Sequence, residues 1–132
     1  MVNVLIVEGC EFVEDVRRII SDVQSDYRIP IDVRTFLTAD DARQYISWAE
    51  VAIVSDDLNG GLPDASGYEF INQLKGKNPD ATAVIYGNRP KRFVPENCRF
   101  DFFVESLSDP QEIIEIVKQY HERRKTVGNP SD

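Results

Sequence analysis

The sequence contains few of the residues that build metal sites, disulfide frameworks and membrane spans. It has two cysteines, Cys10 and Cys98, and a single histidine. The cysteines lie far apart with no CxxC spacing, which argues against a zinc site or a disulfide framework and favours two reduced structural thiols. The apolar stretch near the start, residues 4–7, is too short for a signal peptide or a membrane span and has no basic leader. We therefore expect a soluble, cytoplasmic protein with no membrane partner.

An excess of positive charge is also lacking. The formal net charge is -8 at pH 7, which argues against direct nucleic-acid binding through phosphate neutralisation and leaves a basic partner or a bound cation open. The length of 132 residues is typical of one domain, and a hydrophobic content of 42% is enough for a sizeable core. We expect one domain over residues 1–126, followed by a flexible C-terminal tail over residues 127–132.

Short apolar runs that recur along the chain predict the strands of a parallel sheet. Residues 2–7, 51–54 and 83–86 are nearly continuous apolar runs, which are typical of strands that are covered on both faces. Residues 29–35 alternate between apolar and polar side chains and include a proline, so they predict an edge strand. Residues 100–104 predict a fifth strand.

The segments between these runs carry helical signals, with one exception. Residues 13–23 place apolar side chains three and four positions apart, as an amphipathic helix does. Three later helices are predicted by capping boxes that begin at Thr38, Ser66 and Ser108. Residues 88–99 contain Pro90 and Pro95 and little helical periodicity, so we expect the fourth helix to be short or absent. This alternation predicts an α/β fold with a doubly wound, five-stranded parallel sheet of flavodoxin-like type.

Acidic residues and glycine follow the predicted strands at their carboxyl ends. In a doubly wound sheet, these ends meet at one edge, where ligands bind near the point at which the strand order reverses. The residues that fall there are Glu8, Asp56, Asp57, Gly87 and Glu105. We expect Glu8, Asp56 and Asp57 to form an acidic pocket. Repulsion within this pocket should raise the pKa of at least one carboxyl group unless a cation is bound.

The order of these elements and residues resembles the receiver domain of two-component response regulators over nearly the whole chain. The most specific part is Val-Ser-Asp at residues 54–56, followed by Gly-Tyr-Glu at residues 67–69. It is similar to the receiver pattern of a phosphoacceptor aspartate, a loop and a Gly-x-Glu sequence that opens the third helix. The resemblance implies that Asp56 is the phosphoacceptor, with Ser55 and Asp57 as alternatives. It also implies that Glu8 and Asp56 are ligands of Mg²⁺.

Three of the positions that carry receiver chemistry depart from the family pattern. The acidic pair after the first strand reads Glu8-Gly9, so one of the two expected carboxylates for Mg²⁺ is missing. The position of a threonine or serine hydroxyl after the fourth strand holds Gly87. The position of a lysine that pairs with the phosphate holds Glu105, which reverses the charge. The resemblance therefore implies a degenerate switch that disfavours phosphoryl transfer.

Two further features bear on the resemblance. Phe102 matches the aromatic switch position of receivers, although an aromatic residue in a strand is more often part of the core. The poorly helical segment at residues 88–99 resembles the pseudo-receivers of circadian-clock proteins, in which the fourth helix is irregular.

Three hypotheses about function follow. In the first, which we favour, the chain is a pseudo-receiver that is not an enzyme, requires no cofactor and binds a protein partner largely independently of phosphorylation. In the second, the chain is a phosphorylatable receiver that takes phosphate on Asp56 from a histidine kinase, with Mg²⁺ held at Glu8. In the third, it is a flavodoxin-like domain that binds a small ligand, but the glycine-rich turn that cradles a phosphate after the first strand is missing. No motif identifies the partner, the pathway or the oligomeric state.

Overall fold

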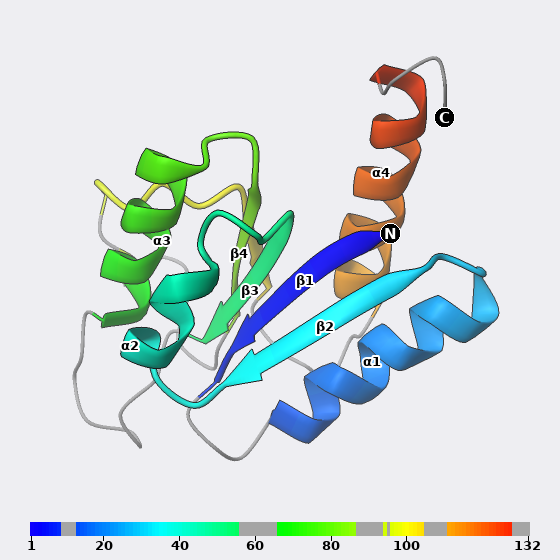
Figure 1. Ribbon diagram of the computed structural model, residues 1–132, viewed down its shortest axis with the longest axis horizontal. Helices are drawn as coiled ribbons and strands as arrows, with labels where there is room; N and C mark the ends of the chain where they lie inside the picture. The colour runs from blue at the N-terminus through cyan, green and yellow to red at the C-terminus, as the bar shows by residue number, and fades with distance from the viewer. Residues whose placement is uncertain (9–12, 56–65, 87–93, 95, 105–110, 128–132) are drawn as a thin grey trace.

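Five parallel strands form one sheet in the computed structural model, which describes residues 1–8, 13–55, 66–86, 94, 96–104 and 111–127. The strand order is β2-β1-β3-β4-β5 (Figure 1). The strands are β1 (Val2–Val7), β2 (Ile31–Phe36), β3 (Val51–Ser55), β4 (Thr82–Tyr86) and β5 (Phe102–Val104). Every neighbouring pair is parallel. The predicted sheet is therefore confirmed, with the three apolar runs in its interior and the alternating strand β2 at an edge.

Helices cover both faces of this sheet (Figure 1). One face carries α1 (Val13–Asp26) and α4 (Gln111–Val127), and the other carries α2 (Ala39–Ala42), the 3-10 helix η1 (Arg43–Tyr45) and α3 (Ser66–Lys77). Between β4 and β5, the residues that are described, Val94 and residues 96–101, form no helix. Among the described helices, none is long and apolar enough to cross a membrane.

The strands contribute side chains to two apolar layers, because successive residues of a strand point to opposite faces. In β1, Val2, Val4 and Ile6 are fully buried in the layer beneath α1 and α4, which we call the α1/α4 layer. Leu5 and Val7 are fully buried in the layer beneath α2 and α3, the α2/α3 layer. Burial on both faces explains why β1 reads as a continuous apolar run.

The helix predicted after Thr38 is present as a short element. Thr38 caps it as predicted, because its Oγ1 accepts a hydrogen bond of 3.2 Å from the backbone N–H of Asp41. However, α2 gives way within one turn to the 3-10 helix η1. Beyond η1, the carbonyl groups of Ile46 and Ala49 accept hydrogen bonds of 3.0 and 2.8 Å from the side-chain amide of Asn78. A distant asparagine thus satisfies carbonyl groups at the end of this short helical segment.

Candidate functional site

The structure describes three of the predicted site residues: Glu8, Phe102 and Ser55, the last of which is an alternative to Asp56 as phosphoacceptor. The role of Ser55 as phosphoacceptor stays a prediction. Gly9, Asp56, Asp57, Gly87 and Glu105 lie outside the described residues, so their predicted places and roles stay predictions. The predicted pKa rise within the acidic pocket also stays a prediction. The site is therefore built here from Glu8 and from the described residues that contact it.

Glu8 lies directly after β1 and continues the pairing of that strand with β2. Its backbone N–H donates a hydrogen bond of 3.0 Å to the carbonyl group of Phe36. The alternation of side chains along β1 directs Glu8 to the same face as Val4 and Ile6, which is the face of the α1/α4 layer. Glu8 is 3% exposed. The sheet thus carries a buried carboxylate at the carboxyl end of an interior strand.

The partner of this carboxylate is Tyr86, the last residue of β4. The hydroxyl group of Tyr86 donates a hydrogen bond to Oε2 of Glu8. Tyr86 is itself buried in the α1/α4 layer. Burying an ionisable group costs free energy unless a partner replaces the water that it loses. The phenol supplies such a partner from inside the protein.

Strand register explains how two residues from separate strands meet. Val7 of β1 lies beside Val54 of β3, and Ser55 lies beside Tyr86. Glu8, Ser55 and Tyr86 therefore form one row across β1, β3 and β4. The outer members of this row are two strand spacings apart, roughly 10 Å between backbones, so long side chains are needed to connect them. Ser55, which is 4% exposed, is a small side chain in the middle of the row.

Phe102, the residue at the aromatic switch position, begins the edge strand β5 and pairs with Val84 of β4. It is 37% exposed, so it is not part of the buried core. The next residue, Phe103, packs against the α2/α3 layer, and its ring contacts that of Phe100 at a centroid distance of 6.4 Å. The aromatic side chain that β5 contributes to packing is therefore Phe103.

A second tyrosine–glutamate contact lies at the amino ends of the strands. The hydroxyl group of Tyr120 in α4 donates a hydrogen bond of 2.8 Å to Oε2 of Glu50. The other carboxylate oxygen of Glu50 accepts a hydrogen bond of 3.0 Å from the backbone N–H of Asn3. This contact joins α4 to the starts of β1 and β3, at the opposite end of the sheet from Glu8.

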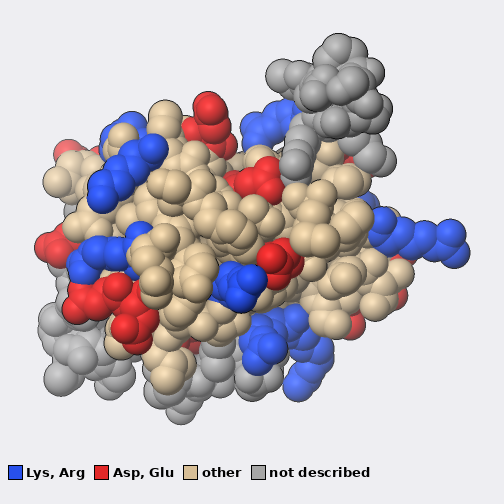
Figure 2. Space-filling model, viewed as in Figure 1, with Lys and Arg blue, Asp and Glu red and all other residues tan. Residues whose placement is uncertain are grey.

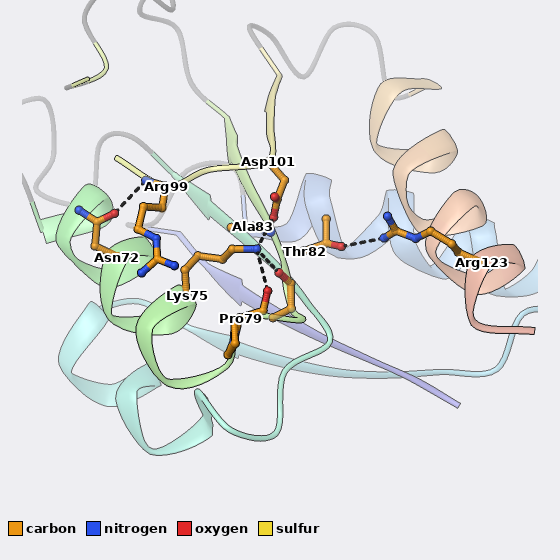
Figure 3. Close-up of polar contacts among 9 residues, drawn as sticks. Asn72, Lys75, Pro79, Thr82, Ala83, Arg99, Asp101 and Arg123 are labelled. Atoms are coloured by element: carbon orange, nitrogen blue, oxygen red, sulfur yellow. Dashed lines mark hydrogen bonds and ion pairs between the residues drawn. The ribbon is translucent and has the colours of Figure 1, made fainter. Parts of the chain in front are cut away.

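A lysine-centred cluster joins α3 to β4 and to the segment before β5 (Figure 3). Nζ of Lys75 donates hydrogen bonds to the carbonyl groups of Pro79 and Ala81, at 3.2 and 2.7 Å, and to Oδ2 of Asp101, at 2.9 Å. The same Asp101 oxygen accepts a hydrogen bond of 2.8 Å from the backbone N–H of Ala83. An ammonium group has three donors, and all three are used here. The cluster thus holds elements together and leaves no donor of Lys75 for a ligand.

The described carboxylates do not fit a Mg²⁺ site. Mg²⁺ requires oxygen ligands in a near-octahedral arrangement. In the part of the chain that the structure describes, no group of three or more histidine, cysteine, aspartate or glutamate side chains is placed to hold a metal ion. Of the two predicted ligands, Glu8 accepts a hydrogen bond from Tyr86, and Asp56 lies outside the described residues. Gly9, the position of the second expected acid, has no side chain to offer.

The charged side chains on the face shown in Figure 2 are mixed in sign. Lysine and arginine side chains are scattered among aspartate and glutamate side chains over this face. Nucleic-acid binding uses a concentrated basic surface to neutralise phosphates. Where the described residues form this face, the charges are mixed and no such concentration is seen.

Comparison with solved structures relates the fold to receiver domains. The chain is similar to a response regulator receiver domain protein (CheY-like) from Methanospirillum hungatei JF-1, with a TM-score of 0.73 and 16% identity over 97% of this chain and 99% of that chain. It is also similar to the signal receiver domain of an HD domain-containing protein from Pseudomonas fluorescens Pf-5, with a TM-score of 0.73 and 15% identity over 95% and 98% of the two chains.

A third similar structure is the response regulator protein TrrA from Thermotoga maritima, solved in complex with Mg(2+)-BeF. The TM-score is 0.68 and the identity 16%, over 91% of this chain and 99% of that chain. No protein-family model and no curated protein matches the sequence. At these identities, the likeness shows the fold, and the predicted flavodoxin-like, receiver-like fold is confirmed.

Proposed function

We propose that this chain is a receiver-like signalling domain of the degenerate, pseudo-receiver type. In this proposal, the chain works in the cytoplasm by binding a protein partner, it is not an enzyme, and phosphorylation of Asp56 is not required for binding. The likeness of the whole fold to receiver domains supports a receiver-like signalling domain. The observation that carries the independence from phosphorylation is the hydrogen bond between Glu8 and Tyr86.

The hydrogen bond matters because of what phosphorylation of an aspartate demands. The transferred phosphoryl group carries negative charge, which a bound cation and nearby basic groups must neutralise. Here the acid after β1 is buried and engaged by Tyr86. The sequence supplies no acid at position 9 and places a glutamate at position 105, where receivers have a lysine. These features all disfavour the transition state of phosphoryl transfer, which supports a function that does not depend on phosphorylation.

Incubation with acetyl phosphate and Mg²⁺ tests this proposal directly. We expect intact-protein mass spectrometry to find the chain unmodified, while a receiver domain that is readily phosphorylated by acetyl phosphate becomes modified in a parallel reaction. Loss of one well-placed charge-stabilising group typically slows a reaction about a hundredfold or more, and here several such groups are replaced. Stoichiometric modification that Asp56→Asn abolishes would instead support the phosphorylatable receiver.

The partner-binding part of the proposal needs a separate measurement. Proteins captured on the immobilised chain are identified by mass spectrometry, and the affinity of each purified candidate is measured by calorimetry. We expect the dissociation constant to stay within about twofold in Asp56→Ala, a difference of roughly 0.4 kcal/mol. A partner that binds the unaltered chain and is lost with Asp56→Ala would contradict phosphorylation-independent action.

A further inference from the structure

We propose that the Tyr86 hydroxyl group takes the place at Glu8 that a divalent cation would need, so that the Glu8–Tyr86 pair is an internal block against cation binding. The inference rests on the proposed function, because it gives the physical reason why the end of β1 does not serve phosphoryl chemistry. At Gly9 an expected ligand is missing from the sequence, whereas at Glu8 the acid is present and its hydrogen bond with Tyr86 is what opposes cation binding.

The position of the pair supports this role. Glu8 lies at the carboxyl end of β1, the edge at which parallel α/β sheets bind their ligands. Its side chain does not extend into solvent, because it is 3% exposed and is directed to the α1/α4 layer, where Tyr86 is 1% exposed. The row of Glu8, Ser55 and Tyr86 is fixed by the pairing of three neighbouring strands. The sheet thus places the phenol within reach of the carboxylate.

A cation would have to break this contact before it could use Glu8. It would need to displace the hydroxyl group from Oε2 and draw the carboxylate out of the α1/α4 layer. Buried hydrogen bonds to charged groups have energies that change an equilibrium constant by about tenfold or more. Removing the hydroxyl group alone should therefore raise the affinity of Glu8 for a cation.

The chain offers a matched control. Tyr120 also donates a hydrogen bond to a glutamate, Glu50, but this pair lies at the amino ends of the strands. Tyr120→Phe removes a phenol–carboxylate contact of the same chemistry, away from the edge that is expected to hold a ligand. A general loosening of the fold would affect both variants, whereas release of a cation site would affect Tyr86→Phe alone.

The test is a titration with Mn²⁺, with free Mn²⁺ measured by electron paramagnetic resonance, followed by competition with Mg²⁺. We expect Tyr86→Phe to bind Mn²⁺ at least tenfold more tightly than the unaltered chain, which corresponds to about 1.4 kcal/mol. Tyr120→Phe should bind like the unaltered chain. The double variant Glu8→Gln, Tyr86→Phe should lose the gain. Circular dichroism checks that each variant is folded.

Two outcomes would overturn the inference: equal affinity in Tyr86→Phe and the unaltered chain, or a gain that persists when Glu8 is also replaced. A measurement on the unaltered chain avoids any folding defect of the variants. Two-dimensional NMR spectra with and without Mg²⁺ should show unshifted amide signals for Glu8 and Tyr86, and saturable shifts there would contradict the block. These readouts involve neither phosphate nor a partner, so they can fail while the proposed function stands.

Discussion

Arg28 shows how a single residue can hold strain at the end of an element. It has a φ of 54°, and it is the one non-glycine residue with positive φ among those that the structure describes. The backbone N–H of Tyr27 donates to the carbonyl group of Val23 at 3.1 Å, so the last turn of α1 closes just before Arg28. Helices often end with a residue in this left-handed conformation, and glycine adopts it without the clash that a Cβ atom causes.

Replacing Arg28 by glycine should therefore stabilise the fold relative to replacing it by alanine. We expect the free energy of unfolding of Arg28→Gly to exceed that of Arg28→Ala by about 1 kcal/mol. Comparing these two variants removes the effect of the arginine charge, which both lack. The measurement is urea denaturation followed by circular dichroism. Ser25→Gly, at an exposed position inside α1, should instead lower the free energy of unfolding by about 0.5 kcal/mol. A more stable alanine variant at position 28 would mean that the positive φ is not kept in solution.

At the scale of elements, the Lys75 cluster determines how α3 is attached to the edge of the sheet. Lys75 connects the last turn of α3 with the carbonyl groups that precede β4 and with Asp101. The side chain of Lys75 is 13% exposed and that of Asp101 is 37% exposed, so the ion pair is partly screened by water. The second role of Asp101, accepting the backbone N–H of Ala83, does not depend on charge.

The two roles of Asp101 can be separated by substitution. Asp101→Ala should lower the free energy of unfolding by about 1–2 kcal/mol, because the Lys75 ammonium group and the Ala83 N–H both lose an acceptor. Asp101→Asn should cost less, since its amide oxygen can still accept a hydrogen bond. Asp32→Ala is the control, because the pair of Asp32 with Arg34 is longer, 3.8 Å, and exposed. It should change stability by less than about 0.5 kcal/mol, measured by urea denaturation. Equal losses in the two Asp101 variants would assign the effect to charge alone.

The sequence predicts elements well where their pattern is local. Residues 2–7, 51–54 and 83–86 become strands because sheet burial on both faces requires continuous apolar runs. The capping box at Thr38 starts α2, but no local pattern reveals that Asn78 bonds the carbonyl groups beyond η1. The fifth strand begins at Phe102 and not at the predicted residue 100. Asp101 comes just before the first residue pair between β4 and β5. Its carboxylate accepts hydrogen bonds from the backbone N–H of Ala83 and from the ammonium group of Lys75.

The candidate site is predicted only in part, because some of its features follow from local sequence patterns and others depend on long-range contacts. The position of Glu8 at a strand end follows from the sequence and is confirmed. Its bond to Tyr86 was not predicted, because it depends on the register of strands that are not neighbours in the sheet. The alternation of side chains along β1 and β4 is the signal that identifies Glu8 and Tyr86 as residues of the same face, once the strand order is known.

At the scale of the whole molecule, the two tyrosine–glutamate pairs lie at opposite ends of one sheet. Asn3, beside Glu50, and Glu8, beside Tyr86, are five positions apart in and just after β1, or roughly 17 Å. Between them, the side chains of Val4 to Val7 are fully buried. The α1/α4 layer connects the two pairs. Val117 of α4 and Tyr86 of β4 belong to this layer, and Tyr120 packs against it. A two-state switch would use such a connection to couple the ends.

The proposed pseudo-receiver function needs no switch between two states, so it predicts that these ends are energetically independent. The effects of Tyr86→Phe and Tyr120→Phe on the free energy of unfolding should add within about 0.5 kcal/mol in the double variant, because the two hydroxyl groups bond different carboxylates at opposite ends of the sheet. Glu8→Gln and Tyr86→Phe should instead be coupled by about 1 kcal/mol or more, since they remove the two sides of one buried contact. Urea denaturation of the two double-mutant cycles provides both values. Coupling between the tyrosines as large as that within the Glu8–Tyr86 pair would reveal a concerted change that links the ends of the sheet, which is the behaviour of a working switch.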